Sequence, residues 1–145
     1  MSELRVDDVM TRNPRTVTAG ASLLAAYECM SEGNFRHLPV VDGRKAVGIL
    51  SDRDVLRHMP PLSRAPFDRA AHGDFLKRAV VEIMTQGPLS VPEGTSLEVA
   101  VELMLVNQVS AVLVVDDAEA LRGILTMVDA AGVLLRLIRG ELSAR

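Results

Sequence analysis

Hydrophobic and polar positions follow the same order twice along this chain. In each half, apolar residues first recur at helical spacing, and two short apolar runs of strand-like composition come next. The helical stripe of the first half opens at Ser22, a residue type that commonly caps helices. The paired apolar runs cover 38–41 with 46–50 and 111–115 with 121–125. Each half is therefore predicted to contain a helix followed by a β-hairpin.

Capping and breaking residues predict where these elements begin and end. Thr95 and Glu98 have the spacing of a capping box, in which two side chains satisfy backbone N–H groups of the first helical turn. The pairs Gly33–Asn34 and Asn107–Gln108 supply the glycine and asparagine that favour helix ends. Pro39 lacks a backbone N–H group, so its strand should meet a sheet edge or a gap at that residue.

A second helix is predicted directly after each hairpin. It begins at Ser51 in the first half and at Thr126 in the second half, where it runs to about Arg139. Short extended segments at 16–17 and 90–91 precede the first helix of each half. The order of elements in each half is thus β-α-β-β-α.

The two halves are copies of one another. With a shift of 74 residues, 13 of the 34 aligned pairs between Val9 and Asp42 are identical, where chance would give roughly two or three. A one-residue insertion changes the shift to 75, and the Gly-Ile-Leu-Ser-x-x-Asp motif at 48–54 then matches Gly-Ile-Leu-Thr-x-x-Asp at 123–129. A tandem duplication explains this agreement.

The amino-acid composition makes several classes of function improbable for this chain. With 48% apolar and 24% charged residues the chain is typical of a globular protein. A net charge of −3 and an aromatic content of 3% argue against nucleic acid as a main partner. Cys29 is the single cysteine, so a disulfide within the chain and a cysteine-built zinc site are excluded. The histidines are not spaced as metal ligands. The charged start and the longest purely apolar run, 111–115, predict a cytoplasmic protein without a signal peptide or membrane helix.

The duplicated layout resembles a stand-alone pair of CBS domains, the adenosine-ligand sensing unit also called a Bateman module. The resemblance covers about residues 6–57 and 79–138. It rests on Val-Met-Thr at 9–11 with Pro14, on Arg-His-Leu-Pro-Val-Val-Asp at 36–42, and on the doubled Gly-Ile-Leu-Ser/Thr-x-x-Asp motif. It implies an α+β fold in which two β-α-β-β-α repeats pack face to face about a pseudo-two-fold axis.

Domain boundaries follow from the repeat and from the residues outside it. We expect the first repeat at 1–59, a connector at 60–78, the second repeat at 79–139 and a C-terminal tail at 140–145. The connector is rich in proline, and residues 74–84 are predicted to form a helix that leads into the second repeat.

The doubled motif suits an adenosine nucleotide. Ser51 adds a hydroxyl donor at a helix start, where a phosphate is favoured, and the Asp54 carboxylate can accept from both hydroxyls of a ribose. Arg53 could bind the phosphate bidentately. Thr126 and Asp129 repeat this arrangement in the second half. The alternative is that Ser/Thr-x-x-Asp is a capping box that binds nothing.

The resemblance implies that each ligand cleft mixes residues of both repeats. One cleft would combine Ser51, Arg53 and Asp54 with Thr85, Pro88, Ser90, Val109, Ser110 and Ala111. The other would combine Thr126 and Asp129 with Thr11, Pro14, Thr16, Phe35, Arg36 and His37. Arg36 and His37 have Ser110 and Ala111 as counterparts, and Arg53 has Val128 as its counterpart, so the two clefts are chemically unequal. For Arg36 and His37 the alternative is a solvated strand edge.

We therefore expect a non-catalytic sensor without a required cofactor. Its ligand is an adenosine nucleotide, AMP in the first place, with ATP, ADP or S-adenosylmethionine as alternatives, and its occupancy is relayed to a separate, unidentified protein. The competing hypothesis is a dimerisation module with vestigial clefts. The apolar stripe of the last helix, 128–138, predicts a homodimer built on this helix and on 52–59. Arg57 or Arg136 could reach a phosphate across this interface, and the preferred alternative is that both are solvated helix residues.

Overall fold

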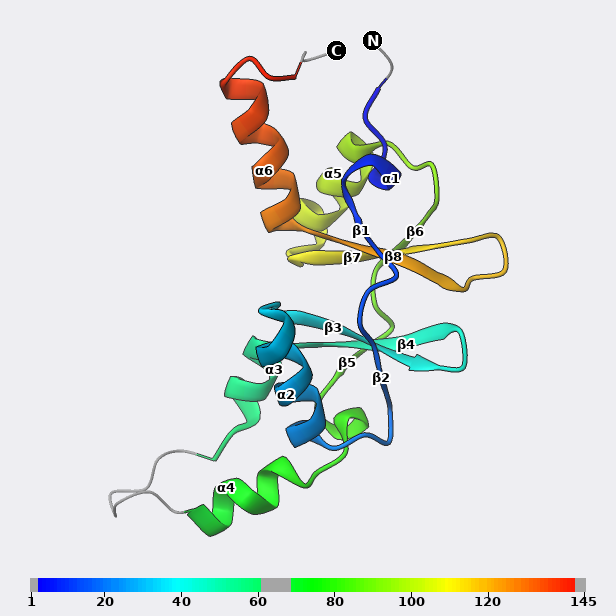
Figure 1. The fold of residues 1–145 in the computed structure, drawn as a ribbon. Coiled ribbons are helices and arrows are strands. Elements are labelled where there is room, and N and C mark those ends of the chain that lie inside the picture. The colour runs from blue at the N-terminus through cyan, green and yellow to red at the C-terminus, as the bar shows by residue number, and fades with distance from the viewer. Residues whose placement is uncertain (1–2, 61–68, 143–145) are drawn as a thin grey trace. The chain divides into compact units, whose positions relative to one another are not determined.

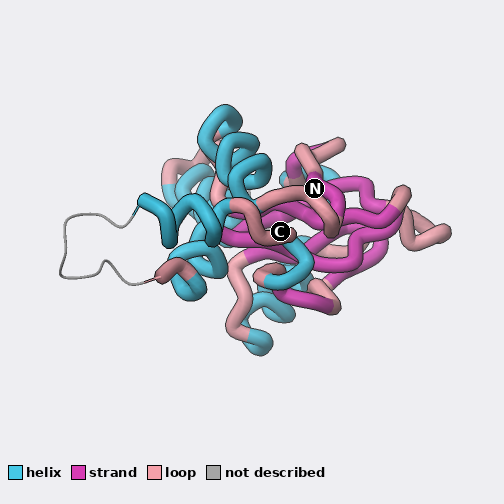
Figure 2. The backbone as a smooth tube through the Cα atoms, turned by 90° about the horizontal axis from the view of Figure 1, so that it is seen from below, coloured by secondary structure: helices cyan, strands magenta, loops and turns pink. Residues whose placement is uncertain are grey.

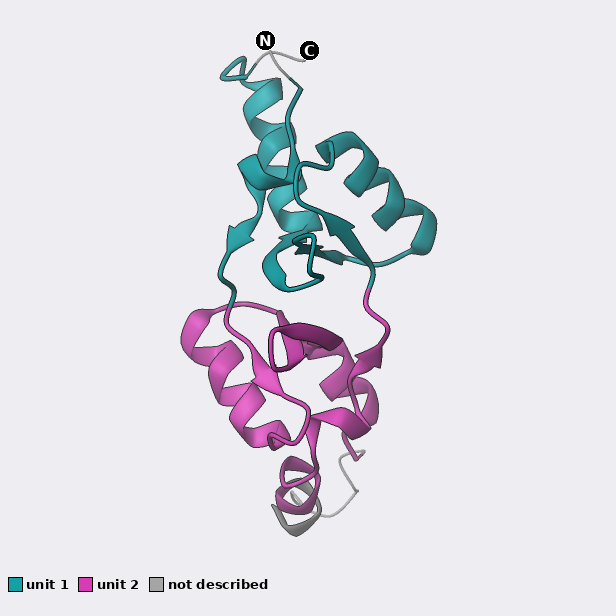
Figure 3. Ribbon diagram, turned by 90° about the vertical axis from the view of Figure 1, so that its right-hand side faces the viewer, with its two compact units in different colours: residues 1–14, 89–145 teal, residues 15–88 magenta. Residues whose placement is uncertain are grey.

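The computed structural model describes residues 3–60 and 69–142, which form two compact units of mixed α and β structure (Figure 1). Helices and strands are both prominent along the chain (Figure 2), in agreement with the predicted α+β class. Unit 1 comprises residues 1–14 and 89–145, and unit 2 comprises residues 15–88 (Figure 3). Each unit contains one four-stranded sheet with helices packed on it.

Unit 2 has the strand order β2-β3-β4-β5. Its strands are β2 (Val17–Thr18), β3 (His37–Asp42), β4 (Lys45–Ser51) and β5 (Thr85–Gln86). Strand β2 is parallel to β3, and the other pairs are antiparallel. Its helices are α2 (Leu23–Gly33), α3 (Asp52–His58) and α4 (Arg69–Leu76), with a 3-10 turn, η1 (Val80–Glu82).

Unit 1 has the equivalent strand order β1-β8-β7-β6. Its strands are β1 (Thr11–Arg12), β6 (Ser90–Pro92), β7 (Ala111–Val115) and β8 (Leu121–Thr126). Its helices are α1 (Val6–Val9), α5 (Leu97–Asn107) and α6 (Met127–Ile138). Within the described residues every helix is too short or too polar to span a bilayer.

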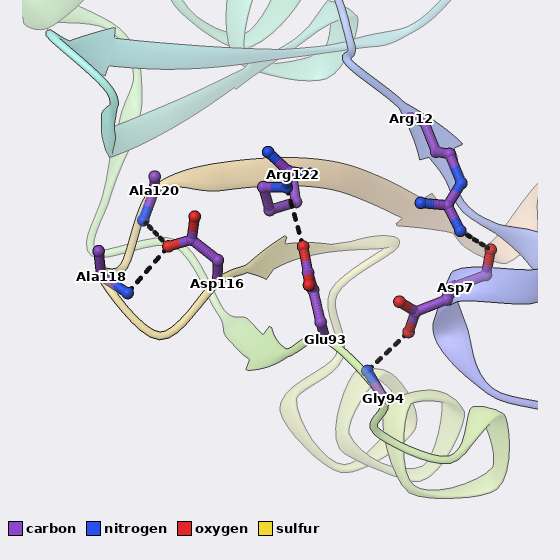
Figure 4. Close-up of polar contacts among 8 residues, drawn as sticks. All are labelled: Asp7, Arg12, Glu93, Gly94, Asp116, Ala118, Ala120 and Arg122. Atoms are coloured by element: carbon purple, nitrogen blue, oxygen red, sulfur yellow. Dashed lines mark hydrogen bonds and ion pairs between the residues drawn. The ribbon is translucent and has the colours of Figure 1, made fainter.

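The first short strand of each repeat pairs with the hairpin of the other repeat. In β1, Thr11 pairs with Ile124, and in β5, Thr85 pairs with Ile49. The exchange of the N-terminal segment is held by polar contacts (Figure 4): the Asp7 carboxylate accepts from the Gly94 N–H at 2.6 Å, and the Arg12 guanidinium donates to the Asp7 carbonyl at 3.1 Å. The compact units therefore do not coincide with the sequence repeats.

The hairpin of unit 1 is fixed by side chains of its own (Figure 4). The Asp116 carboxylate accepts from the N–H groups of Ala118 and Ala120, each at 2.9 Å, and so closes the turn between β7 and β8. Arg122 on β8 forms a 2.8 Å ion pair with Glu93, which lies between β6 and α5. The ion pair connects the hairpin to the segment that leads into helix α5.

The predicted first helices and hairpins are confirmed, with one correction at a helix start. Ser22 caps α2 as predicted, since its hydroxyl accepts from the Ala25 N–H at 3.1 Å. Helix α5 is capped by Ser96 rather than by Thr95 with Glu98. The Thr95 hydroxyl instead donates to the Pro92 carbonyl at 2.7 Å, which removes it from the helix.

Both helix ends lie where the sequence predicts them. Helix α2 ends at Gly33 and α5 ends at Asn107, and the next residues, Asn34 and Gln108, adopt the left-handed conformation with φ of 53° and 54°. This conformation lets their N–H groups donate back to carbonyls of the last helical turn.

Pro39 meets a gap in the sheet, as predicted. Strand β3 is an inner strand, yet its pairing with β2 begins only at Val40, one residue after Pro39. The counterpart of Pro39 in the other repeat is Leu113, whose N–H donates to the Leu89 carbonyl at 2.9 Å. Since proline cannot make this bond, the strand beside β3 is one residue shorter than the strand beside β7.

The predicted helix at 74–84 is wrong in its extent. Helix α4 ends at Leu76, and only the 3-10 turn η1 follows. The backbone leaves the helix because the N–H groups of Val80 and Val81 donate to the carbonyls of Ala21 and Ala19, at 2.8 and 3.0 Å. Bonds to a distant segment thus replace the bonds that would have continued the helix.

Each unit has its own apolar core between its sheet and its helices. The core of unit 2 includes Leu23, Met30, Leu38, Val40 and Leu50, together with residues of the expected connector and the following turn, namely Phe75, Val80 and Ile83. The core of unit 1 includes residues from the start of the chain and from the second repeat, namely Val6, Met10, Val91, Ala100, Met104, Val112, Val114 and Leu125. The segments at 75–84 and 4–10 are therefore integral parts of these cores.

A glycine in each hairpin allows the exchanged strand to pass close to the sheet. A Cβ atom on Gly48 would lie 2.5 Å from the Met84 sulfur and 2.9 Å from the Thr85 carbonyl oxygen. A Cβ atom on Gly123 would likewise meet the Met10 sulfur, and it would lie 3.0 Å from the Thr11 carbonyl oxygen. Only glycine leaves room for the methionine side chain and the strand that follows it.

We expect Gly48→Ala to lower the free energy of unfolding by about 1–3 kcal/mol, because the new methyl group displaces Met84 or separates β4 from β5. Urea denaturation monitored by circular dichroism measures this change. Gly132→Ala is the control, because that glycine lies within α6 with open space around it. It should stabilise the protein by about 0.5–1 kcal/mol. Equal stability of Gly48→Ala and the wild type would refute the close approach.

Candidate functional site

A reciprocal capping box joins β4 to α3. The Ser51 hydroxyl accepts from the Asp54 N–H at 3.1 Å, and the Asp54 carboxylate accepts from the Ser51 N–H at 2.9 Å. Strand β4 ends at Ser51 and α3 begins at the next residue, so no loop separates them. We call this arrangement the Ser51–Asp54 box.

The same arrangement joins β8 to α6. The Thr126 hydroxyl accepts from the Asp129 N–H at 3.2 Å, and the Asp129 carboxylate accepts from the Thr126 N–H at 2.9 Å. The backbone angles of the two capping residues agree, with φ of −112° in both and ψ of 162° and 163°. The Thr126–Asp129 box is thus the structural duplicate of the first.

Both motifs therefore form capping boxes, and the capping bonds leave acceptor capacity on the carboxylates. In the first box, Asp54 Oδ2 accepts the Ser51 N–H, while Oδ1 faces the Thr85 hydroxyl at 3.5 Å. A carboxylate has about four acceptor positions. Capping and acceptance of ligand hydroxyl groups are therefore compatible in the same side chain.

Asp54 is also set apart by its burial. Among the described side chains it is the buried charged one, with 9% of its surface exposed. Strand β5, which comes from the second repeat, brings Thr85 to it. His58 supports the same turn, since its Nδ1 lies 2.8 Å from the Asp54 carbonyl oxygen. A buried carboxylate is stable in an apolar surrounding only when it is hydrogen-bonded in this way.

The residues at the start of β3 lie beside the Ser51–Asp54 box. The Asp52 N–H donates to the Arg36 carbonyl at 3.0 Å, and His37 pairs with Ser51 across the hairpin. The corresponding contacts in unit 1 come from Ser110, whose carbonyl accepts from the Met127 N–H at 2.9 Å, and from Ala111, which pairs with Thr126. Each box therefore has its own pair of strand residues next to it within one unit.

The side chains around the two boxes differ in charge. Arg36, His37 and Arg53 accompany the first box, whereas Ser110, Ala111 and the exposed Val128 take their places at the second. The Asp129 carboxylate is only partly buried. With the same backbone, the first box therefore has arginine neighbours within its own unit, and the second box has neutral ones.

The pKa of His37 is lowered from its ordinary value. Burial of the half-buried imidazole is the main cause, and Arg53 and Arg36 lower the pKa further, while Asp52 and Asp54 raise it. The net effect favours the neutral imidazole. The sequence pattern did not point to Asp52 as a group that acts on His37, although its place between Ser51 and Arg53 at the helix start could have suggested it.

The other predicted ligand residues lie on short segments of the two units. Thr11 is in β1, and Thr16 precedes β2. Ser90 opens β6, and Val109 is an exposed residue shortly after α5. Pro14 and Pro88 are the residues at which the chain changes from one compact unit to the other. The grouping of these residues into two mixed clefts stays a prediction.

No metal centre is formed by the described side chains, in which histidine, cysteine, aspartate and glutamate do not gather in groups of three or more. Cys29 is a buried free thiol packed in the core of unit 2. The hydroxyl and carboxylate groups of the boxes are suited to hydrogen bonding and charge pairing.

Comparison with known proteins gives two matches to the CBS domain, at residues 6–61 and 80–136. The chain is similar to the acetoin utilization protein AcuB of Vibrio cholerae, with 27% identity, a TM-score of 0.78, and coverage of 98% of this chain and 99% of that one. It is also similar to CBSX2 of Arabidopsis thaliana, solved in complex with AMP, with 31% identity, a TM-score of 0.73, and coverage of 92% and 98%.

A third similar structure is the CBS domain pair of protein MJ0100, solved with 5′-methylthioadenosine and S-adenosyl-L-methionine. It has 27% identity, a TM-score of 0.74, and coverage of 90% of this chain and 98% of that one. Among curated proteins, the first five matches are longer, and the chain spans 22–45% of their lengths.

We expect Asp54→Ala to lower the free energy of unfolding by about 1–2 kcal/mol, because it removes the cap and leaves the Ser51 N–H without its acceptor. Asp129→Ala should have a smaller effect of the same sign, because that carboxylate is more exposed. Urea denaturation measures both values. Asp117→Ala, at an exposed turn position, is the control and should leave stability unchanged. A fully stable Asp54→Ala variant would contradict the capping role.

Proposed function

Because the chain belongs to the CBS domain family, as its two domain matches establish, we propose that it is a non-catalytic regulatory module that binds an adenosine nucleotide. The observation that carries the proposal is the pair of equivalent boxes, each with a carboxylate that keeps free acceptor positions. Two structural neighbours were solved with adenosine ligands, AMP in one and 5′-methylthioadenosine with S-adenosyl-L-methionine in the other. These ligands support an adenosine-type ligand here.

The residues of the first box have distinct proposed roles. Asp54 accepts from the ribose hydroxyls, for which its Oδ1 atom is suited by its position beside Thr85. Arg53 pairs with the phosphate, and Ser51 contributes its hydroxyl as a further donor. In the second box, Asp129 and Thr126 take the ribose and donor roles without an equivalent of Arg53.

The remaining proposed contacts follow the family resemblance. Thr85, Pro88, Ser90, Val109, Ser110 and Ala111 are proposed to line the cleft of the first box. Thr11, Pro14, Thr16, Phe35, Arg36 and His37 are proposed to line the cleft of the second box. AMP is the first candidate ligand, and ADP, ATP and S-adenosylmethionine are the alternatives.

The regulatory output is proposed to reach a separate protein. Several curated relatives are longer enzymes, such as the homoserine O-acetyltransferase of Methanocorpusculum labreanum, of which the chain spans 23% at 32% identity and 87% coverage of its own length. In this chain the CBS matches and the described structure occupy nearly the whole length. The competing function is a dimerisation module whose boxes serve only as caps.

Helix α6 supports a proposed homodimer. Its apolar residues form two seams, and one of them packs on unit 1 through Met127 and Val133. The second seam, at Val128, Ala131, Leu135 and Ile138, has the three- and four-residue spacing of a coiled-coil face, and Val128 and Ile138 are 76% and 73% exposed. Leu56 on α3 is also 67% exposed. A second copy of the chain is the proposed partner of α3 and α6.

Purified, ligand-free protein is expected to bind an adenosine nucleotide with micromolar affinity, or about −8 kcal/mol. A thermal-shift screen with AMP, ADP, ATP and S-adenosylmethionine, followed by calorimetry, tests this, because a ligand that binds only the native state raises the melting temperature. Asp54→Ala and Asp129→Ala should each remove binding at their own site, while Asp117→Ala binds normally. Absence of heat with every adenine ligand would favour the dimerisation module.

Light scattering at micromolar concentration should give twice the chain mass of 15.7 kDa. The double variant Val128→Glu with Ile138→Glu should give the single-chain mass, because it places charges on the exposed seam of α6. Val106→Glu is the matched control, since Val106 on α5 is 74% exposed. A wild-type mass of one chain, with or without nucleotide, would refute the homodimer, and dissociation by Val106→Glu alone would place the interface on α5.

A further inference from the structure

The carboxylates of the two boxes differ in how far the protein shields them from water. Asp54 has 9% of its surface exposed, whereas Asp129 is only partly buried. The boxes themselves are alike, since the two carboxylates accept from the N–H groups of Ser51 and Thr126 at the same distance, 2.9 Å. The difference in burial therefore comes from the surroundings of the boxes.

One of these surroundings is the exchanged strand of each unit. Strand β5 runs beside β4, and its Thr85 hydroxyl lies 3.5 Å from Asp54 Oδ1. Thr11 in β1 holds the equivalent place beside β8. Among the described residues, however, the Asp129 carboxylate is bonded only within its own box. The exchanged strand thus brings a donor to the carboxylate in unit 2, and the described groups of unit 1 do not repeat this contact.

The Oδ1 atom of Asp54 is poorly supplied with donors in the free protein. A good O–H···O bond spans about 2.5–3.0 Å, so the Thr85 hydroxyl at 3.5 Å is a distant donor. Burial makes this shortage costly, because it withholds the water that would otherwise donate to the carboxylate. A ligand hydroxyl that donates to Oδ1 of Asp54 therefore gains more than one that donates to Asp129, which is more accessible to water.

We propose that the Ser51–Asp54 box requires a ligand with an intact ribose diol, whereas the Thr126–Asp129 box accepts a deoxyribose almost equally well. The inference rests on the proposed function, in which both carboxylates accept from ribose hydroxyls, and it assigns a different ligand class to each box. A deoxyribose leaves Oδ1 of Asp54 without a close donor at a place shielded from water. At Asp129 a water molecule replaces the missing hydroxyl, so little affinity is lost.

Thr85 limits how strong the preference of the first box can be. It is the protein group that still faces Oδ1 of Asp54 when the ligand hydroxyl is missing. Replacement by valine keeps the shape of the side chain and removes this donor. The affinity for a deoxyribose ligand should then fall further, and the preference for ribose should increase. Thr85 thus acts on the ligand through Asp54.

Calorimetry with AMP, 2′-deoxy-AMP and 3′-deoxy-AMP tests the inference on variants that keep one box each. Asp129→Ala keeps the Ser51–Asp54 box, and Asp54→Ala keeps the Thr126–Asp129 box. For each variant the affinity for AMP is divided by the affinity for each deoxy compound, and the larger ratio is used. Comparing this ratio between variants cancels what the missing hydroxyl does to the nucleotide itself. Circular dichroism checks that each variant is folded.

We expect a ratio of about 30 or more for Asp129→Ala and of about three or less for Asp54→Ala. Added to Asp129→Ala, Thr85→Val should raise the ratio by about threefold or more. Thr18→Val is the matched control and should leave the ratio unchanged, because Thr18 is also an exposed threonine in a two-residue strand. This pair of variants keeps Asp54, so the inference stays testable even if Asp54→Ala does not fold.

Two results would overturn the inference and differ from failure of the proposed function. Equal ratios for Asp129→Ala and Asp54→Ala would show that burial of the carboxylate does not set the preference, while nucleotide binding itself would stand. A ratio that Thr85→Val leaves unchanged or lowers would remove the role of the Oδ1 donor. If AMP produces no heat with the wild type or with any variant, the proposed function fails, and the ribose preference fails with it.

Discussion

The direct junction between a hairpin strand and the following helix is the constraint on which both units depend. At Ser51 and at Thr126 the chain passes from strand to helix without a loop. As in every helix, the first N–H groups have no partners inside the helix. The reciprocal hydrogen bonds of the two boxes give some of these N–H groups an acceptor, and they fix the direction in which α3 and α6 leave the sheet. The carboxylate needed for capping is thereby held in a defined position, and the same position makes it available to a ligand.

A second constraint is the exchange of the first short strand between the repeats. Strand β5 passes over Gly48 and places Thr85 beside Asp54, and β1 passes over Gly123 in the same manner. The cores of both units combine residues from the two sequence repeats, such as Val6 with Met104 and Leu23 with Ile83. Neither repeat can therefore complete its own core, and the duplication is a structural requirement as well as an evolutionary record.

The two copies keep the same backbone while their side chains differ. The capping residues share their dihedral angles to within a degree, but Arg53 corresponds to Val128 and Pro39 corresponds to Leu113. Burial lowers the pKa of His37 beside the first box, whereas the residue at the equivalent place in the second repeat, Ala111, has no titratable group. Chemical selectivity in this protein is thus expected to depend on a few side chains around an invariant backbone frame.

Much of the fold and the centre of each candidate site could be predicted from the sequence. Apolar spacing and capping residues predict the helix that follows Ser22, the helix that ends at Asn107, and both hairpins. They also predict the two Ser/Thr-x-x-Asp boxes. These features depend on interactions between residues three or four positions apart, or across a tight turn, so local patterns are sufficient to predict them.

Other features were decided only by tertiary structure. The spacing of Thr95 and Glu98 predicted a capping box for α5. In the structure the Thr95 hydroxyl donates to the Pro92 carbonyl instead, and Ser96 caps the helix. The helix expected to reach Met84 ended at Leu76, because the following N–H groups found acceptors near Ala21. The exchanged strands have only two residues each, and the residues alone did not place Thr85 against Asp54. Such short strands carry too little local information to specify their partners, and the packing of distant segments determines where they lie.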